Sequence, residues 1–331
     1  MTEFDYYKEE KEKIACNLCG SGDFSILAKY SKNGLKATTV ICRRCALIFI
    51  SPRMKKEGYD HYYRHHYRAD RTAIKGNEPN LEENFTSAEK FGRGWARRYR
   101  AYLKDGLTVD VGSSTGGLLL GLKKEIPSLK VLGIEPSLDE SGYANRKGVP
   151  TKMLLFEDLE EEVKEKASNV FCVQSLNHLL DPMEFLKWSY QVLNEGGYVH
   201  LAVKNWRHQV RRAGIISAGI QIDHVYMFLP ETLKRMVEAA GFKIVDFDVD
   251  EKKSREEISR QKQEGFNIHH IRLVARKSNI RHRVSYISSR SLYLRTRMAL
   301  SPFPLKLYYL FWYSRLLAPI RKALFLDGRR H

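Results

Sequence analysis

A small-residue turn between a short apolar run and a helix start constrains the fold of this chain more than any other feature. The run Val109–Val111 carries an acid and is followed by glycine, and a turn leads into the apolar residues 118–122. Further along, Val131–Glu135 is a second short apolar run that ends in an acid. A turn of this kind lets backbone N–H groups approach a ligand, and an acid at the tip of the next strand can bind a ribose diol. The two runs therefore predict a site for a nucleoside-containing cofactor.

The spacing of the glycines distinguishes between such cofactors. A dinucleotide-binding turn has Gly-x-Gly-x-x-Gly, in which the second glycine admits a pyrophosphate. In this chain Ser114 stands at that second position, and the next glycine is Gly116. The form Asp110-x-Gly-x-x-x-Gly116 resembles the first motif of class I S-adenosylmethionine-dependent methyltransferases. The resemblance implies that the turn holds the methionine part of the cofactor and that Glu135 holds the ribose hydroxyls. The alternative is a glycine turn that only reverses the chain.

Composition limits the class of protein. The 331 residues are 43% hydrophobic and 29% charged, which is typical of a soluble globular protein with one large domain and attachments, or with two domains. Residues 1–13 are acidic and polar, unlike a signal peptide, and no apolar run reaches the ~20 residues of a membrane span. We expect a cytoplasmic protein, either free or peripheral at the inner membrane face.

The net charge of +17 is concentrated near the C-terminus. Residues 251–331 hold 19 Lys and Arg against 5 Asp and Glu, whereas the first 250 residues hold 37 against 34. An acidic partner, if there is one, is therefore expected to meet the C-terminal segment.

Four of the five cysteines form two Cys-x-x-Cys pairs, Cys16 with Cys19 and Cys42 with Cys45. In a reducing compartment two such pairs are typical of a zinc site. Four thiolates complete a tetrahedral coordination shell and leave no place for a reactive water, so the spacing predicts structural zinc. Redox-active or simply buried thiols are the alternative. Cys172 lies in an apolar run and is expected in the core.

The motifs taken together resemble a narrower group. Cys16-x-x-Cys-Gly, the segment Cys42–Arg53, the tyrosine-rich stretch Tyr59–Tyr67 and the cofactor motif occur here in that order. This order resembles bacterial and archaeal methyltransferases with an N-terminal zinc-binding module, among them enzymes of deoxysugar, polysaccharide and secondary-metabolite synthesis. The resemblance covers roughly residues 14–250. It implies S-adenosylmethionine as cofactor and a sugar, glycan or related small metabolite as acceptor, methylated at a hydroxyl.

Alternating apolar runs and helical patterns predict an α/β fold with a doubly wound, mainly parallel sheet. The resemblance implies the seven-stranded Rossmann-like methyltransferase sheet. We divide the chain into a zinc-binding module (1–53), a helical connector or cap (54–104), the methyltransferase domain (105–277) and a basic helical tail (278–331). The expected strands are 107–111, 131–135, 150–155, 170–175, 197–203, 242–249 and a last antiparallel strand within 267–277 at the sheet edge. The expected helices are 117–125, 138–147, 182–193 and 231–240.

Residues 301–326 mix aromatic, aliphatic and basic side chains behind Pro302 and Pro304. The segment is too charged to span a bilayer. It predicts either an interfacial helix on an anionic membrane, where a lipid-linked acceptor would lie, or a helix that packs on the body of the protein or on a second subunit.

Cofactor and acceptor should meet beyond the carboxyl ends of the central strands. The fourth strand of the domain leads into Asn177–His178, and Asp223–Phe228 contains a His-x-x-x-Phe pattern; both segments resemble family motifs. Methyl transfer to a hydroxyl requires removal of a proton, and the histidine pKa suits that task. His178 and His224 are therefore the candidate bases, and the alternative is that they brace the strand ends.

The resemblance assigns the cofactor contacts to Asp110, Gly112, Ser113, Gly116, Glu135, Gln174 and, by a choice between two neighbouring acids, Asp158 rather than Glu157. Tyr62 and Tyr63 are candidates either for the acceptor pocket or for packing.

Some residues depart from the family pattern. Ser113 stands in place of Cys or Gly, and Asn169 and Asn177 stand where acids are common. Asn169 and Asn177 leave open a non-catalytic cofactor-binding or interaction protein. A further alternative is an RNA methyltransferase whose zinc-binding module and basic tail bind phosphates. Against the RNA methyltransferase, the zinc-binding module is not notably basic and no known RNA-binding motif is evident.

Overall fold

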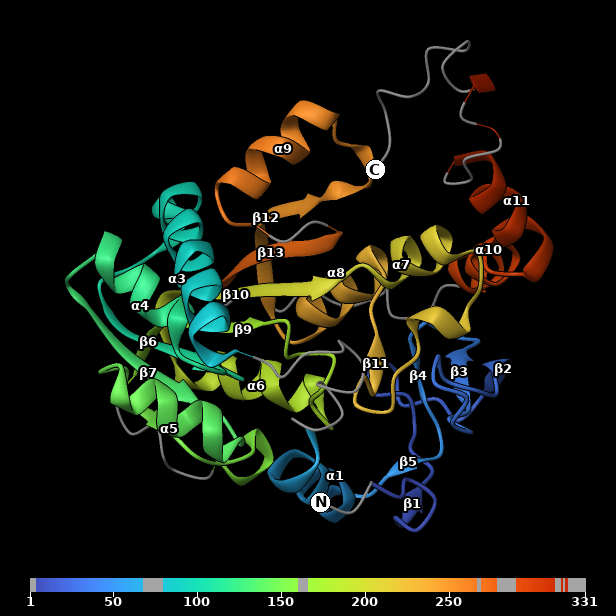
Figure 1. Ribbon diagram of the computed structural model, residues 1–331, viewed down its shortest axis with the longest axis horizontal. Helices are drawn as coiled ribbons and strands as arrows, with labels where there is room; N and C mark the ends of the chain where they lie inside the picture. The colour runs from blue at the N-terminus through green and yellow to red at the C-terminus, as the bar shows by residue number, and fades with distance from the viewer. Residues whose placement is uncertain are drawn as a thin grey trace.

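A seven-stranded sheet forms the centre of the computed structural model, which describes residues 4–67, 80–159, 166–266, 269–278, 290–312, 317 and 319–320 (Figure 1). The strand order is β12-β13-β10-β9-β6-β7-β8. The strands are β6 (Gly106–Val111), β7 (Leu129–Ile134), β8 (Thr151–Lys152), β9 (Ala167–Val173), β10 (Leu193–Lys204), β12 (Phe242–Val249) and β13 (His270–Lys277). The expected strands are thus present, although β8 is shorter than the range 150–155.

The sheet is parallel except at one strand. β6 pairs in parallel with both β7 and β9, and β9 pairs in parallel with β10. β13 is antiparallel to both of its neighbours, β10 and β12. The expected edge position of the last strand is therefore wrong, because β12 forms the edge. β13 inserts between β10 and β12, which pairs both of its hydrogen-bonding sides and buries most of its residues.

Helices cover both faces of the sheet. Phe171 of β9 packs in one core with residues of α3 (Leu81–Arg98), α4 (Gly117–Glu125) and α5 (Leu138–Arg146). The next residue, Cys172, lies in the other core, with α6 (Pro182–Val192) and α8 (Pro230–Ala239). This alternation is the period of two that places successive strand side chains on opposite faces. The other helices described before the tail are α1 (Lys56–His65), α7 (Trp206–Ala213) and α9 (Arg255–Gln263), with short 3₁₀ turns η1 (Arg100–Tyr102), η2 (Phe156–Asp158), η3 (Ser217–Gly219) and η4 (Asp250–Lys252).

The N-terminal module has its own small sheet. β2 (Phe24–Ala28), β3 (Thr39–Cys42) and β4 (Ile48–Ile50) are antiparallel neighbours. A fourth strand, β11 (Tyr226–Met227), joins this sheet beside β4. It comes from the segment assigned to the methyltransferase domain, so the small sheet extends across that boundary. A separate pair links β1 (Lys11–Glu12) to β5 (Arg53–Met54).

The described part of the tail packs on the body. α10 (Arg290–Ala299) lies against β2, where the hydroxyls of Tyr293 and Ser25 are 3.1 Å apart. α11 (Pro302–Trp312) lies beside α7, with the Arg211 guanidinium 4.7 Å from the Tyr308 ring centre (Figure 1). Among the described helices none has the length and apolar character needed to cross a bilayer. Residues 313–316, 318 and 321–326 of the predicted interfacial segment lie outside the described residues.

Candidate active site

A cavity of about 470 Å³ lies at the carboxyl ends of the central strands. It reaches the ends of β6, β7, β9 and β10, and α1 contributes Tyr59 and Tyr63 to its wall. The strands that follow β6 in the chain lie on both of its sides, β7 on one and β9 on the other. Such a reversal of strand order opens a crevice between the loops, where α/β sheets bind their ligands.

The turn after β6 has a backbone that only small residues fit. Gly112 has a φ of +76°, and a Cβ atom placed on it would lie 2.2 Å from the Ser175 hydroxyl oxygen. The N–H groups of Gly112 and Ser113 donate to the Ile134 carbonyl, at 2.8 and 3.0 Å. The turn is therefore held against the end of β7, close to Glu135, and leaves its inner side open to the cavity.

Two buried acids face this part of the cavity. The Glu135 carboxylate accepts from the backbone N–H groups of Ser114, at 2.8 Å, and Ser137, at 3.0 Å. Burial raises the pKa of Glu135 to about 7. Burial, and then the neighbouring Glu135, raises the pKa of Asp110 to about 8. Among the described residues, Oδ1 of Asp110 has no hydrogen-bond partner. A buried acceptor without a donor is costly, and a ligand that donates to it would remove that cost.

The structure places some of the predicted cofactor contacts in the cavity wall and others outside it. Asp110, Gly112, Ser113, Glu135 and Gln174 line the cavity. Two others do not line it: Gly116 and Asp158. Gly116 caps α4 with a φ of +77° and packs against Ala144 and Val149. Asp158 pairs with Lys56, at 2.9 Å, while Glu157 lines the cavity and accepts from the Leu180 N–H at 2.9 Å.

The residues present fit an adenosyl cofactor. The glycine turn admits close approach, Glu135 keeps acceptor capacity beyond its two backbone donors, and the unpartnered oxygen of Asp110 requires a donor. These are the groups that a ribose diol and a neighbouring ammonium would satisfy.

Both candidate bases lie at the same end of the cavity. The rings of His178 and His224 are perpendicular, with centres 4.7 Å apart. Nδ1 of His178 is 3.0 Å from the Tyr63 hydroxyl and 3.7 Å from a carboxylate oxygen of Asp223. The structure thus brings together residues from α1, the loop after β9 and the segment before β11.

Burial and the mutual interactions of the charged groups determine the protonation states of Asp223, His224 and Tyr63. Burial lowers the pKa of His224 well below its usual value, although Asp223 opposes this. Burial alone would raise the pKa of Asp223, but His224, His178 and Lys204 together hold it below its ordinary value. Burial raises the pKa of Tyr63 well above 10. Near neutral pH the cluster therefore contains an ionised Asp223, a neutral His224 and a neutral Tyr63.

Sequence reasoning did not assign a role to Asp223 or Lys204, both of which belong to this end of the site. Asp223 is adjacent to a candidate base, so its position was a usable signal. Asn169, in contrast, has no place in the cavity. Its amide oxygen accepts from the Lys104 N–H, and its amide nitrogen donates to the Lys104 carbonyl and to the Thr108 hydroxyl. Asn169 is therefore a buried residue whose hydrogen bonds are made within the core. Asn177 does line the cavity.

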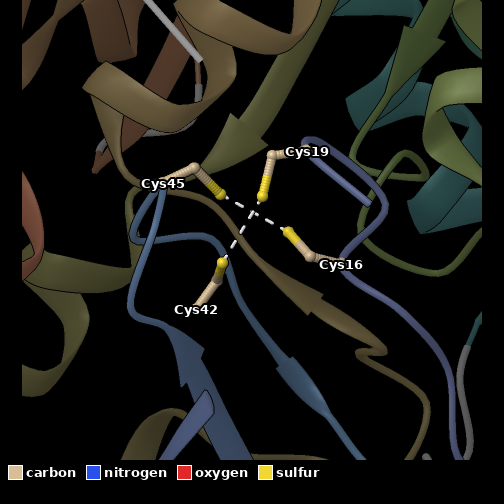
Figure 2. Close-up of side chains that lie close together, drawn as sticks. All are labelled: Cys16, Cys19, Cys42 and Cys45. Atoms are coloured by element: carbon tan, nitrogen blue, oxygen red, sulfur yellow. Dashed lines mark hydrogen bonds between the residues drawn. The ribbon is translucent and has the colours of Figure 1, made fainter. Parts of the chain in front are cut away.

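The four paired cysteines converge in the N-terminal module (Figure 2). Sγ of Cys16 is 3.4 Å from that of Cys45, and Sγ of Cys19 is 3.5 Å from that of Cys42. All four sulfur atoms lie within 4.8 Å of one another. A tetrahedral Zn²⁺ with 2.3 Å bonds requires separations of about 3.8 Å, so small shifts would accommodate the ion. The donor set fits structural zinc.

Comparisons with known proteins are consistent with this site. Residues 92–246, just under half of the chain, match the sequence profile of a family described as "Methyltransferase domain". No curated protein gives a significant sequence match.

Among solved structures, the chain resembles the plantazolicin methyltransferase BpumL in complex with S-adenosylhomocysteine, at 12% identity and a TM-score of 0.48 over 66% of this chain and 94% of that one. It also resembles a S-adenosylmethionine-dependent methyltransferase from Archaeoglobus fulgidus, at 21% identity and a TM-score of 0.44 over 59% and 97%. A third is the CcbJ methyltransferase from Streptomyces caelestis, at 17% identity and a TM-score of 0.43 over 56% and 88%.

Residues 92–246, which include most of the seven-stranded sheet, match a methyltransferase domain, and the four-cysteine module precedes them in the chain.

Proposed function

We propose that the protein transfers a methyl group from S-adenosylmethionine to a hydroxyl of a sugar, glycan or related metabolite. The observation that carries the proposal is a single cavity that joins Asp110 and Glu135 at one end to His178 and His224 at the other. An electrophile held by the acids would face a nucleophile held by the histidines. Holding two reactants in line is most of what methyl transfer requires of an enzyme.

His178 is the proposed base. S-adenosylmethionine supplies an electrophilic methyl group bonded to a sulfonium sulfur. As the acceptor oxygen forms its bond to the methyl carbon, the carbon–sulfur bond breaks and its electron pair remains on sulfur. The hydroxyl proton passes to the His178 imidazole. Asp223, 3.7 Å from the ring nitrogen of His178, favours the imidazolium that forms, and Tyr63 fixes the ring orientation.

His224 has a different proposed part. Its ring stands perpendicular to that of His178, and its depressed pKa keeps it neutral. A neutral imidazole can donate one hydrogen bond and accept another. His224 would therefore bind and orient the acceptor, while Asn177 and Lys204 supply further polar contacts on the same wall.

The cavity suits a ring-shaped polar acceptor. Tyr59, Tyr63 and Tyr67 line it, and Leu154 and Phe156 add apolar surface. Aromatic faces beside a few directed polar groups are typical of pockets that bind small molecules in a fixed orientation. This combination supports a sugar or small-metabolite acceptor.

The test uses S-adenosylmethionine with a labelled methyl group, the zinc-loaded full-length protein and an extract of the host. The extract is afterwards separated into lipid, soluble-sugar and glycan, small-molecule and nucleic-acid fractions. Label in a sugar, glycan or lipid-linked fraction, absent with His178→Ala, supports the proposal. Label in RNA would overturn it, and so would the absence of transfer into any fraction.

We also propose that the tail meets an anionic membrane surface, where a lipid-linked acceptor would be within reach. α10 and α11 bury Leu292 and Leu305 against the body but leave Phe303 77% and Leu307 56% exposed beside Lys306. Exposed apolar side chains with basic neighbours suit the interface of an anionic bilayer.

Co-sedimentation with vesicles tests this second proposal. Vesicles containing phosphatidylserine should retain the protein, and vesicles of phosphatidylcholine alone should not. The double variant Phe303→Ser, Leu307→Ser should lose the retention, while Tyr30→Ser, an exposed aromatic residue outside the tail, should keep it. Equal behaviour with both vesicle types would contradict the proposal.

A further inference from the structure

We propose that the four-cysteine module positions the acceptor end of the active site, so that its metal ion holds in place the two segments that carry His178 and His224. The names of the two ends rest on the proposed function; the contacts that couple the module to these segments do not.

The segment that carries His224 is built into the module's own sheet. Tyr226 and Met227 pair with Phe49 and Ile48 of β4. The N–H of Ile50 donates to the Val225 carbonyl at 2.9 Å. These bonds lie within four residues of Asp223 and His224, so the position of β4 determines where those two side chains are presented.

Two more contacts hold the same segment further upstream. The Lys32 N–H donates to the Ile220 carbonyl at 3.0 Å. The Tyr59 hydroxyl, at the start of α1, donates to the Ile222 carbonyl at 3.2 Å. Residues 220–227 are therefore attached to the N-terminal region at several points along their length.

The loop that carries His178 is held by side chains of the module. The Arg53 guanidinium donates to the buried Leu180 carbonyl and also pairs with Glu12 at 2.9 Å. The same carbonyl accepts from the Tyr226 hydroxyl at 3.2 Å. Two residues after His178, the loop is thus joined both to the module and to the His224 segment.

Asn17 makes the most direct link to the metal site. It stands between Cys16 and Cys19, and its amide donates to Asp181 at 2.7 Å. The amide oxygen of Asn17 accepts from the Met183 N–H at 2.9 Å. Because Asp181 also caps α6, the turn that contains two of the sulfur ligands is fixed to the end of the His178 loop. An ion that fixes this turn also fixes the start of α6.

The cofactor end shows no comparable attachment. In the described part of the chain, no hydrogen bond or ion pair joins residues 14–53 to residues 109–117 or 131–135. Asp110, Gly112 and Glu135 are positioned by the central sheet and its loops, in which the Ser175 hydroxyl donates to the Gly112 carbonyl at 3.1 Å. Removal of the metal should therefore loosen one end of the cavity and spare the other.

Hydrogen exchange of backbone amides measures this directly and does not depend on turnover. The full-length zinc-loaded protein is compared with the same protein after chelation. We expect exchange in residues 176–183 and 220–228 to accelerate by at least about tenfold, with residues 109–117 and 131–135 unchanged. S-adenosylhomocysteine affinity should change by less than about twofold, because in the described residues no hydrogen bond joins the module to the Gly112 turn or to Glu135.

A uniform acceleration over both ends would overturn the inference, since the ion would then support the whole fold. Unchanged exchange in 176–183 and 220–228 after loss of the zinc would also overturn it. If the zinc-loaded protein failed to bind S-adenosylhomocysteine, the proposed function would fall, and the exchange pattern would still decide the role of the module.

A variant that keeps all four cysteines provides the second test. Arg53→Met removes the donor to the Leu180 carbonyl and should accelerate exchange in residues 176–183 without releasing zinc. Turnover should fall by about tenfold at constant S-adenosylhomocysteine affinity, as expected for loss of a charge-assisted hydrogen bond to a buried carbonyl. Arg43→Met is the matched control, because among the described residues the Arg43 side chain makes an exposed ion pair with Asp23 inside the module and none with the His178 loop. Equal exchange in the two variants would contradict the inference.

Discussion

The hydroxyl of Tyr63 lies 3.0 Å from Nδ1 of His178 and joins α1 to a loop 115 residues further along the chain. Asp223 lies 3.7 Å from the same ring nitrogen. The imidazole is therefore held from two sides, by a neutral hydroxyl and by a carboxylate. This arrangement orients His178 toward the cavity and makes Tyr63 a positioning residue for the proposed base.

Tyr63→Phe should lower turnover by about fivefold, the value of one neutral hydrogen bond. The affinity for S-adenosylhomocysteine should stay within about twofold, because Tyr63 contacts His178 at the acceptor end of the cavity. Tyr30→Phe, on an exposed tyrosine, is the control. Unchanged turnover in Tyr63→Phe would contradict the positioning role, and an equal loss of turnover and of S-adenosylhomocysteine affinity would assign Tyr63 to packing alone.

His178→Ala should lower turnover by about 10²- to 10⁴-fold, the range for loss of a general base. The affinity for S-adenosylhomocysteine should stay unchanged, because His178 is at the acceptor end. His65→Ala removes an exposed histidine from α1 and should have no effect on either quantity. A His178→Ala protein with nearly full turnover would remove His178 from the chemistry.

Gly112→Ala should abolish cofactor binding. Its Cβ would lie 2.2 Å from the Ser175 hydroxyl oxygen, in a backbone conformation with φ of +76°. Gly148→Ala is a matched control, because Gly148 has a φ of +79° with no atom within 4 Å of its added Cβ. Both variants should lose about 1 kcal/mol of stability through backbone strain. Calorimetric titration with S-adenosylhomocysteine should separate them, and equal affinities would place the cofactor elsewhere.

Ligand affinity should rise as the pH increases from about 6 to 8. The folded-state pKa values of Asp110, about 8, and Glu135, about 7, are raised by burial. Ribose hydroxyls donate best to the ionised carboxylates, which become populated over this window. Methylthioadenosine is the probe, since it keeps the ribose and lacks the amino acid whose ammonium also titrates.

The raised pKa values of Asp110 and Glu135 make the ligand-free protein less stable toward unfolding as the pH rises. A raised carboxyl pKa contributes stability that is present below the unfolded value near 4 and is lost as the pH rises through 7 to 8.

Glu135→Gln tests the binding prediction and should flatten the pH dependence of methylthioadenosine binding. Binding that weakens with rising pH would contradict the assigned roles of the two acids.

The cofactor end could be predicted from the sequence because its signal is local. Asp110, Gly112 and Glu135 lie in or directly after two short strands at fixed spacing, and the pairing of these parallel strands brings their ends together. The choice between Glu157 and Asp158 could not be made in this way. Both lie in the 3₁₀ turn η2, which directs Glu157 to the cavity and Asp158 to Lys56.

The acceptor end depends on contacts between distant segments, which a single sequence does not reveal. β11 is a two-residue strand with no readable periodicity, so its pairing with β4 left no signal. In the sequence nothing distinguishes Arg53 from a surface arginine, because its hydrogen bond to the Leu180 carbonyl joins positions 127 residues apart. The order of β12 and β13 was mistaken for a similar reason, because both have strand patterns and the sequence does not say which forms the edge.

Calorimetric titration of the zinc-loaded protein with S-adenosylmethionine tests the central claim most directly. We predict one site per chain, competition by S-adenosylhomocysteine, and at least about tenfold weaker binding in Asp110→Ala and in Glu135→Ala, each of which removes a carboxylate proposed to accept from the cofactor. Absence of binding, or binding that both substitutions leave intact, would show that this cavity is not the cofactor site.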